Sequence, residues 1–151
     1  MVWVNFYGEL FFLAVAALAG LLMAVQGSMN SVVSRAIGVS GATFIVHLTA
    51  TLVMAVVIFS GAGRAAWEKY DSVPWYDYLG GAIGVLITYA VVMSIPKLGA
   101  AVATTAIIVG QVLTACLLDH FGFFGLEKAP FTWLRFFGLV LLSIGAKLIL
   151  N

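Results

Sequence analysis

Residues 99–118 read GAAVATTAIIVGQVLTACLL, and this run of about 20 residues contains no charged side chain. Four more apolar stretches of similar length cover residues 10–29, 42–60, 79–95 and 133–150. An α-helix rises about 1.5 Å per residue, so each stretch is long enough to cross the roughly 30 Å hydrocarbon core of a bilayer. The sequence therefore predicts an integral membrane protein.

The composition leaves little of the chain outside the membrane. The 151 residues are 64% hydrophobic and only 9% charged, whereas a soluble domain is about 25% charged. The longest polar stretch, residues 61–77, is too short to form a second domain. The apolar stretches also lack the alternating pattern of barrel strands. We therefore expect one all-α transmembrane domain over residues 1–151.

Five transmembrane helices are expected, separated by short polar or glycine-rich connections such as a turn at residues 38–41 and a link at residues 96–99. Residues 1–8 contain no Lys or Arg, so the first helix is predicted to be retained rather than cleaved as a signal peptide. The expected helices cover about residues 9–30, 42–60, 77–95, 99–118 and 133–150.

Positive charges are divided almost evenly between the two membrane sides that five helices would create. The cations are Arg64, Lys69, Lys128 and Arg135 on the side of the N-terminus, and Arg35, Lys97 and Lys147 on the other. Because an excess of Lys and Arg favours the cytoplasmic side, four against three sets no firm orientation. Either the chain inserts in both directions and pairs with an inverted copy of itself, or a partner or the insertion machinery fixes its orientation.

Polar side chains within the predicted helices are candidates for a substrate site, because they are costly in hydrocarbon. Gln26 and Asn30 are four residues apart and share a helix face. Gln111 and Thr104, seven residues apart, also share a face, and Gly110 leaves room beside the Gln111 amide. The alternative for these residues is a structural role in hydrogen bonds between helices.

The remaining ionisable residues near the membrane each have two interpretations. His47 could change its charge near neutral pH and contribute to the site, or it could be a neutral imidazole bonded to a threonine one turn away. Asp119 and His120 could form a gate or a proton entry point, or they could simply end a helix before a glycine turn. Glu9 lies close to a helix end, where the helix dipole favours a carboxylate, and we expect it to be structural.

Patterns that indicate catalysis are absent from the sequence. There is no Ser/His/Asp set, HExxH, CxxC or Walker loop, and the two histidines lie far apart in the sequence. A net charge of +1 gives no basic surface for nucleic acid. We expect no enzymatic activity, no metal, no cofactor and no nucleic-acid partner.

Several motifs together resemble those of a known family. The run LGAAVATT at residues 98–105, the pair Gly110-Gln111 and the run DHFGFFG at residues 119–125 resemble a helix-four signature. Further similar positions are residues 26–30 in the first helix, Trp75, Gly80 and Gly81 at the start of the third, and residues 96–99 after it. The family is a small five-helix bacterial inner-membrane family of the drug/metabolite transporter superfamily, related to the small multidrug resistance transporters.

The resemblance implies small-molecule transport, often export, by antiparallel pairs of five-helix chains, as dual-topology homodimers, paired homologues or ten-helix fusions. It places the protein in the bacterial inner (plasma) membrane. The central glutamate of small multidrug exporters has no counterpart here, because Glu9 lies near a helix end.

The sequence thus predicts a transporter that binds a small polar or weakly charged molecule and works by alternating access in an antiparallel homodimer. Its partners would be the lipid bilayer, a second inverted copy and an unidentified substrate. The predicted substrate-binding residues are Gln26, Asn30, Gln111, His47 and Thr104. The alternatives are a small dual-topology channel and a membrane assembly subunit that transports nothing.

Overall fold

The computed structural model describes the backbone of residues 2–149 and the side chains of residues 8–149, and it contains no β-strand in this range. The four α-helices are α1 (Val2–Phe59), α2 (Gly80–Leu98), α3 (Ala100–Phe121) and α4 (Trp133–Ile149). Short 3-10 helices occupy the connections: η1 (Trp67–Ser72), η2 (Trp75–Leu79) and η3 (Phe123–Gly125). The predicted all-α class is confirmed.

Helix α1 bends at a single glycine. Its 58 residues would extend about 87 Å if straight, far beyond the roughly 30 Å of a hydrocarbon core. Gly38 breaks the helix with φ 80° and ψ 163°, a backbone conformation that is essentially restricted to glycine. The bend divides α1 into a first arm, residues 2–37, and a second arm, residues 39–59. The predicted turn at residues 38–41 is therefore shorter than expected, because one glycine is enough to reverse the chain.

The corner between α2 and α3 is also formed by a single glycine with positive φ. Gly99 alone separates the two helices, and its φ of 83° and ψ of 157° nearly equal those of Gly38. Helix α2 continues through Pro96 to Leu98, although a link was predicted to begin at Pro96. The proline lies in the last turn, where its missing N–H removes one backbone hydrogen bond without ending the helix.

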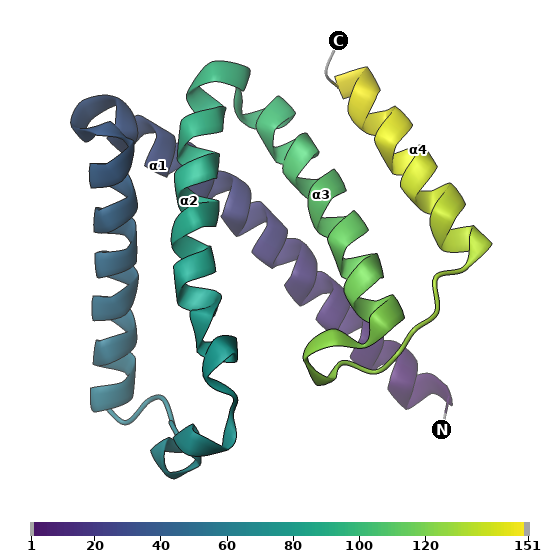
Figure 1. The fold of residues 1–151 in the computed structure, drawn as a ribbon, viewed down its shortest axis with the longest axis horizontal. Helices are drawn as coiled ribbons and strands as arrows, with labels where there is room; N and C mark the ends of the chain where they lie inside the picture. Colours follow the sequence, from purple (N-terminus) through teal and green to yellow (C-terminus); the bar gives the residue numbers. More distant parts are fainter. Residues whose placement is uncertain (1, 150–151) are drawn as a thin grey trace.

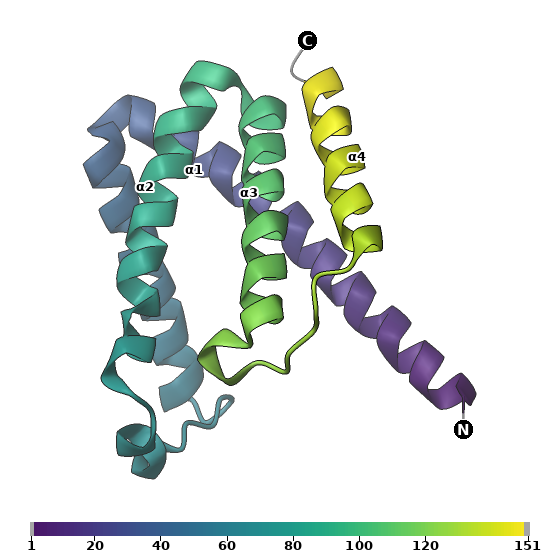
Figure 2. The same cartoon turned by 45° about the vertical axis from the view of Figure 1, so that its right-hand side comes forward.

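The second arm of α1, α2, α3 and α4 lie in a row, and the first arm of α1 crosses one face of this row obliquely (Figure 1). Figure 2 shows the same crossing from another direction, with the first arm passing behind α2 and α3. The bend within α1 and the α2–α3 corner lie at the upper end of the helices in Figure 1, and the start of α1, the α1–α2 connection and the α3–α4 connection lie at the lower end. The connections thus alternate between two ends, as expected for a multi-pass protein.

Three helical segments are long and apolar enough to cross a membrane: Gly8–Phe59, Trp75–Leu98 and Ala100–Phe121. The first contains both arms of α1. Helix α4 has only 17 residues, about 25 Å of helix. The membrane class is confirmed, whereas the count of five spans stays a prediction that requires each arm of α1 and α4 to cross.

Small residues allow the first arm of α1 to approach α2. A Cβ added at Gly27 would lie 3.0 Å from Ile95 Cδ1 and 3.2 Å from Val91 Cγ1. Ala42 and Val92 are completely buried, and Ser31 and Thr43 nearly so. Most other apolar side chains of the described residues are exposed in the isolated chain, which suits a protein whose outer surface faces lipid. Close backbone approach at small residues is the usual basis of helix packing in membranes.

Candidate functional site

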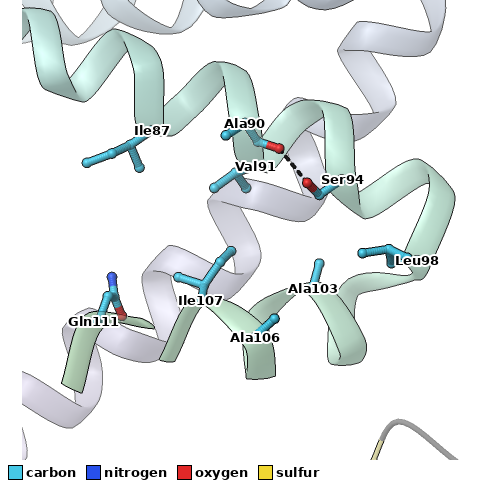
Figure 3. Close-up of a pocket in the computed structure, with 9 residues that line it drawn as sticks. All are labelled: Ile87, Ala90, Val91, Ser94, Leu98, Ala103, Ala106, Ile107 and Gln111. Carbon is cyan, nitrogen blue, oxygen red and sulfur yellow. Dashed lines mark hydrogen bonds between the residues drawn. The ribbon is translucent and has the colours of Figure 1, made fainter. Parts of the chain in front are cut away.

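A cleft of about 410 Å³ lies between α2 and α3. Figure 3 shows the side chains of the two helices facing each other across this space, with Leu98 near one end and Gln111 at the other. Its other lining residues are small or aliphatic: Ile87, Ala90, Val91, Ser94, Ala103, Ala106 and Ile107. The Ser94 hydroxyl donates a hydrogen bond to the Ala90 carbonyl at 2.7 Å, so the Gln111 amide is the least engaged polar group of the cleft (Figure 3).

A second and smaller cavity, about 160 Å³, lies where the first arm of α1 crosses α2 and α3. We call it the inner chamber. Its lining residues are Gly20, Met23, Ala24, Ile87, Val91, Ile95, Thr104, Ile107, Ile108 and Gln111. The cleft and the chamber share Ile87, Val91, Ile107 and Gln111. These four residues therefore form the boundary between the two spaces.

Gln111 and Thr104 are the polar residues of the inner chamber. Elsewhere on α3, the Thr105 hydroxyl donates to the Ala101 carbonyl at 2.8 Å, as is usual for hydroxyls inside helices. By contrast, neither the Thr104 hydroxyl nor the Gln111 amide makes a hydrogen bond to any residue that the structure describes. Both side chains are thus available to a bound molecule.

The electrostatic character of both spaces is neutral. Among the described residues, no Asp, Glu, Lys, Arg or His lines the cleft or the chamber. A charged molecule would enter without a counter-charge, and burial of an unpaired charge in an apolar space is strongly unfavourable. Such a lining is more compatible with an uncharged molecule than with a charged one. Likewise, residues 8–149 contain no group of three His, Cys, Asp or Glu side chains that could hold a metal ion.

The structure brings together only two of the five predicted substrate-binding residues, Thr104 and Gln111. Gln26 is exposed and lines neither cavity, whereas Asn30 is buried, with 9% of its surface exposed. The two residues are only one helical turn apart, yet the Gln26 side chain is exposed and the Asn30 side chain is packed against neighbouring residues. A single polar cavity that contains all five residues does not form within one chain.

His47 lies on the second arm of α1, where this arm faces α2. Its Nδ1 atom is 2.9 Å from the Thr43 carbonyl oxygen, and its Nε2 atom is 3.8 Å from the position of a Cβ on Gly84. The ring is half-buried between the two helices and lines neither the cleft nor the chamber. Its contacts correspond to the structural interpretation, with a backbone carbonyl in place of the expected threonine hydroxyl.

Asp119 and His120 hold the connection between α3 and α4. The His120 Nδ1 atom accepts a hydrogen bond from the Phe131 N–H at 3.1 Å, and Asp119 pairs with Arg135 at 3.7 Å. The Asp119 carbonyl also accepts the Ala129 N–H at 2.9 Å. These contacts agree with the structural interpretation of the two residues, and none of them reaches the cleft.

Replacing Arg135 with lysine is expected to loosen this connection without changing the charge of the protein. The guanidinium Nη1 that pairs with Asp119 also donates to the Ala129 carbonyl at 3.2 Å, and the flexible side chain of lysine would hold these two contacts less rigidly than the guanidinium does. Since partly exposed ion pairs contribute about 0–1 kcal/mol, amide hydrogen exchange in residues 122–132 should accelerate up to about fivefold. The matched control Lys147→Arg, at the other end of α4, should leave that rate unchanged. Equal exchange rates in the two variants would show that the contacts of Arg135 with Asp119 and Ala129 do not stabilise the connection.

The apolar residues of the site could not be identified from the sequence. Ile87, Val91 and Ile107 resemble any other aliphatic residue of a membrane helix, because nothing in their identity marks the cavity side. The one available signal is the group of small residues on α2 and α3, such as Ala90, Ala103 and Ala106, that keeps the cleft open.

Membrane-length helices with an uncharged cleft between them are typical of a multi-pass membrane transporter. Residues 11–148 match a protein family described as "Putative inner membrane exporter, YdcZ". The chain belongs to this family, and it is a multi-pass protein of the inner membrane. The match confirms the resemblance to a bacterial inner-membrane family of the drug/metabolite transporter type, and it indicates transport rather than catalysis. Comparisons with curated proteins and with solved structures found no match.

Proposed function

We propose that the protein exports an uncharged, largely apolar small molecule, which binds at Gln111 between α2 and α3. The observation that supports this proposal most directly is the position of Gln111 at the boundary of the two cavities. An apolar pocket with a few polar groups is the usual form of a small-molecule site. A molecule held by this amide has space on both sides of it.

The shared lining suggests how transport could be controlled. A molecule that passes from the cleft to the inner chamber must move between Val91 on α2 and Ile107 on α3, since both residues line both spaces. A small change in the separation of the two helices would open or close this boundary. Alternating access requires such a movement around a fixed binding group, and Gln111 would be that group.

The working unit in this proposal is an antiparallel pair of two identical chains. The near balance of cations on the two sides supports insertion in both directions. Two-fold symmetry would present each Gln111 from opposite sides of the membrane, which makes the inward and outward paths equivalent. Gln26, exposed on the first arm of α1, belongs to the surface available for the second copy.

The lining of the site narrows the predicted substrate class. The sequence suggests a polar or weakly charged molecule, on the basis of amide and hydroxyl residues that were expected to lie together. Only Thr104 and Gln111 do so, and the other residues of both cavities are aliphatic, small or, at Met23 and Ser94, weakly polar. The proposed substrate therefore has an apolar body and one or two hydrogen-bonding groups.

The test is to compare export by wild-type protein and by the variant Gln111→Leu. Untargeted mass spectrometry of cells and medium would identify uncharged compounds whose ratio of external to internal concentration rises when the wild-type protein is expressed. Leucine keeps most of the side-chain volume and removes the amide, so this ratio should return to about the level of cells without the protein. One hydrogen bond contributes about 0.5–1.5 kcal/mol to binding. Because Gln111 would also position the substrate during transport, its replacement should reduce export by more than this loss of binding free energy.

The matched control for this test uses the neighbouring threonines of α3. Thr104→Val removes a hydroxyl that lines the chamber, whereas Thr105→Val removes one that is bonded to its own helix. Export should fall several-fold in the first variant and stay at the wild-type level in the second. Equal export by Gln111→Leu and wild-type protein would contradict the proposed site, and unitary currents in planar bilayers would indicate a channel instead.

A further inference from the structure

The inner chamber differs from the cleft in being smaller and in being lined by three helices, α1, α2 and α3. Its volume is about 160 Å³, against about 410 Å³ for the cleft. The first arm of α1 covers it with Gly20, Met23 and Ala24, and a Cβ added at Gly20 would meet no atom within 4 Å. The space is therefore open because small residues stand where larger ones would fit.

The size of the chamber defines what can occupy it. An engineered protein cavity of about 150 Å³ with an aliphatic and aromatic lining stays dry and binds benzene. The chamber has nearly the same volume, and its walls are mainly aliphatic, with Ile87, Val91, Ile95, Ile107 and Ile108. A single six-membered ring fills such a space, whereas a fused polycyclic molecule does not.

The polar groups of the chamber add a second requirement. Thr104 and Gln111 are seven residues apart on α3, which places them about 10.5 Å apart along the helix axis. They therefore lie toward opposite ends of an otherwise apolar space, and neither is engaged by another described residue. A ring that carries a hydroxyl or an amide can hydrogen-bond to one of them while its apolar part contacts the isoleucines.

We infer that the inner chamber is a selective subsite for an uncharged single-ring group that carries one hydrogen-bonding substituent, such as a phenol. This inference rests on the export function proposed above and specifies its substrate class. The ring would occupy the space between α1, α2 and α3, and larger parts of a substrate would extend past Val91 and Ile107 into the cleft. An anionic or cationic ring of the same size is excluded, because the chamber offers it no counter-charge.

The experiment uses the full-length protein in lipid nanodiscs and phenol as the probe. In a Cys116→Ser background, Ala24→Cys places a thiol on the chamber wall, and its rate of reaction with a small neutral methanethiosulfonate reports whether the chamber is occupied. Phenol should slow this reaction at least about fivefold, and benzoate, a charged ring of similar size, should not. Ile108→Cys repeats the measurement from the α3 wall, in case the first variant is poorly folded.

The controls separate occupation of the chamber from dissolution of phenol in the lipid. Ala19→Cys lies on the same arm of α1, is exposed and lines neither cavity, so phenol should not slow its reaction. Gly20→Leu, which fills the chamber, should abolish the protection of Cys at position 24. Thr104→Val should raise the phenol concentration needed for half-protection about fivefold, as expected for one lost hydrogen bond.

The inference would be overturned by equal protection at positions 19 and 24, or by equal protection by phenol and benzoate. Efflux of phenol from proteoliposomes tests the proposed export separately. Protection without efflux would support the subsite and contradict export of this class. Efflux that is blocked by Gln111→Leu, without protection at position 24 or 108, would support export and overturn the chamber as the subsite.

Discussion

Gly38→Val and Gly99→Val should each destabilise the fold by about 1–3 kcal/mol, the usual cost of holding a residue with a side chain in a sparsely populated backbone region. Both glycines have φ near +80° and ψ near 160°, and a β-branched residue is especially disfavoured there. No atom lies within 4 Å of a Cβ added at either position. The cost is therefore conformational and does not come from a clash.

The measurement is the fraction of monodisperse protein that survives heating after extraction into mild detergent. A destabilisation of about 1–3 kcal/mol lowers the ratio of folded to unfolded protein by a factor of about 5–150. Gly81→Ala is the matched control, since Gly81 lies in the first turn of α2 with free space around its added Cβ. This control should be neutral or more stable by up to about 1 kcal/mol. If all three variants behaved alike, the backbone argument would be wrong.

Wild-type protein should insert in both orientations in nearly equal amounts. In a Cys116→Ser background, Glu127→Cys places a thiol in the α3–α4 connection without changing the number of Lys and Arg residues. An impermeant maleimide should label about half of these thiols in intact cells and the rest only after the cells are opened. The reason is the four-to-three division of cations, which gives the insertion machinery little preference. A single orientation in the wild-type protein would contradict the antiparallel pair.

Added lysines should convert this mixture into one orientation and abolish export. Ala65→Lys with Ser72→Lys adds positive charge at the end of the row with the α1–α2 connection, so that this end should become cytoplasmic. Ala36→Lys with Ser40→Lys at the Gly38 corner should give the reverse orientation. Each double variant alone should be inactive, and their coexpression should restore export, because only the mixture provides antiparallel pairs. Activity of either double variant alone would indicate a parallel or monomeric transporter.

The membrane class and most helix positions follow from the sequence because hydrophobicity and length are local properties. The run from Gly99 to Leu118 predicts α3 almost to its ends, and observed α3 covers Ala100–Phe121. The exact residues at which one helix ends and the next begins are harder to predict from hydrophobicity and length. Pro96 suggests the end of a helix, yet α2 passes through it, since a proline in the last turn removes only one backbone hydrogen bond.

For the candidate site, too, the sequence predicts which residues are polar, but it does not predict which of them line a cavity. The sequence predicts Gln111 and Thr104 as site residues, because polar side chains stand out in an apolar helix and a spacing of seven places them on one face, and both line the inner chamber. It also suggested Gln26, Asn30 and His47, for which the same reasoning holds but the packing differs. Whether a helix face lies toward a cavity, another helix or lipid depends on how the first arm of α1 crosses α2 and α3.

The sequence by itself therefore determined that this is a membrane protein and that it is all-α. It also gave a short set of polar residues that could form a binding site. The tertiary structure decided that Gln111 stands between two cavities and that Thr104 faces the smaller one, while His47 contacts a backbone carbonyl. The physical reason is that helix periodicity fixes which residues share a face. Only the bend at Gly38 and the close approach at Gly27 fix what each face meets.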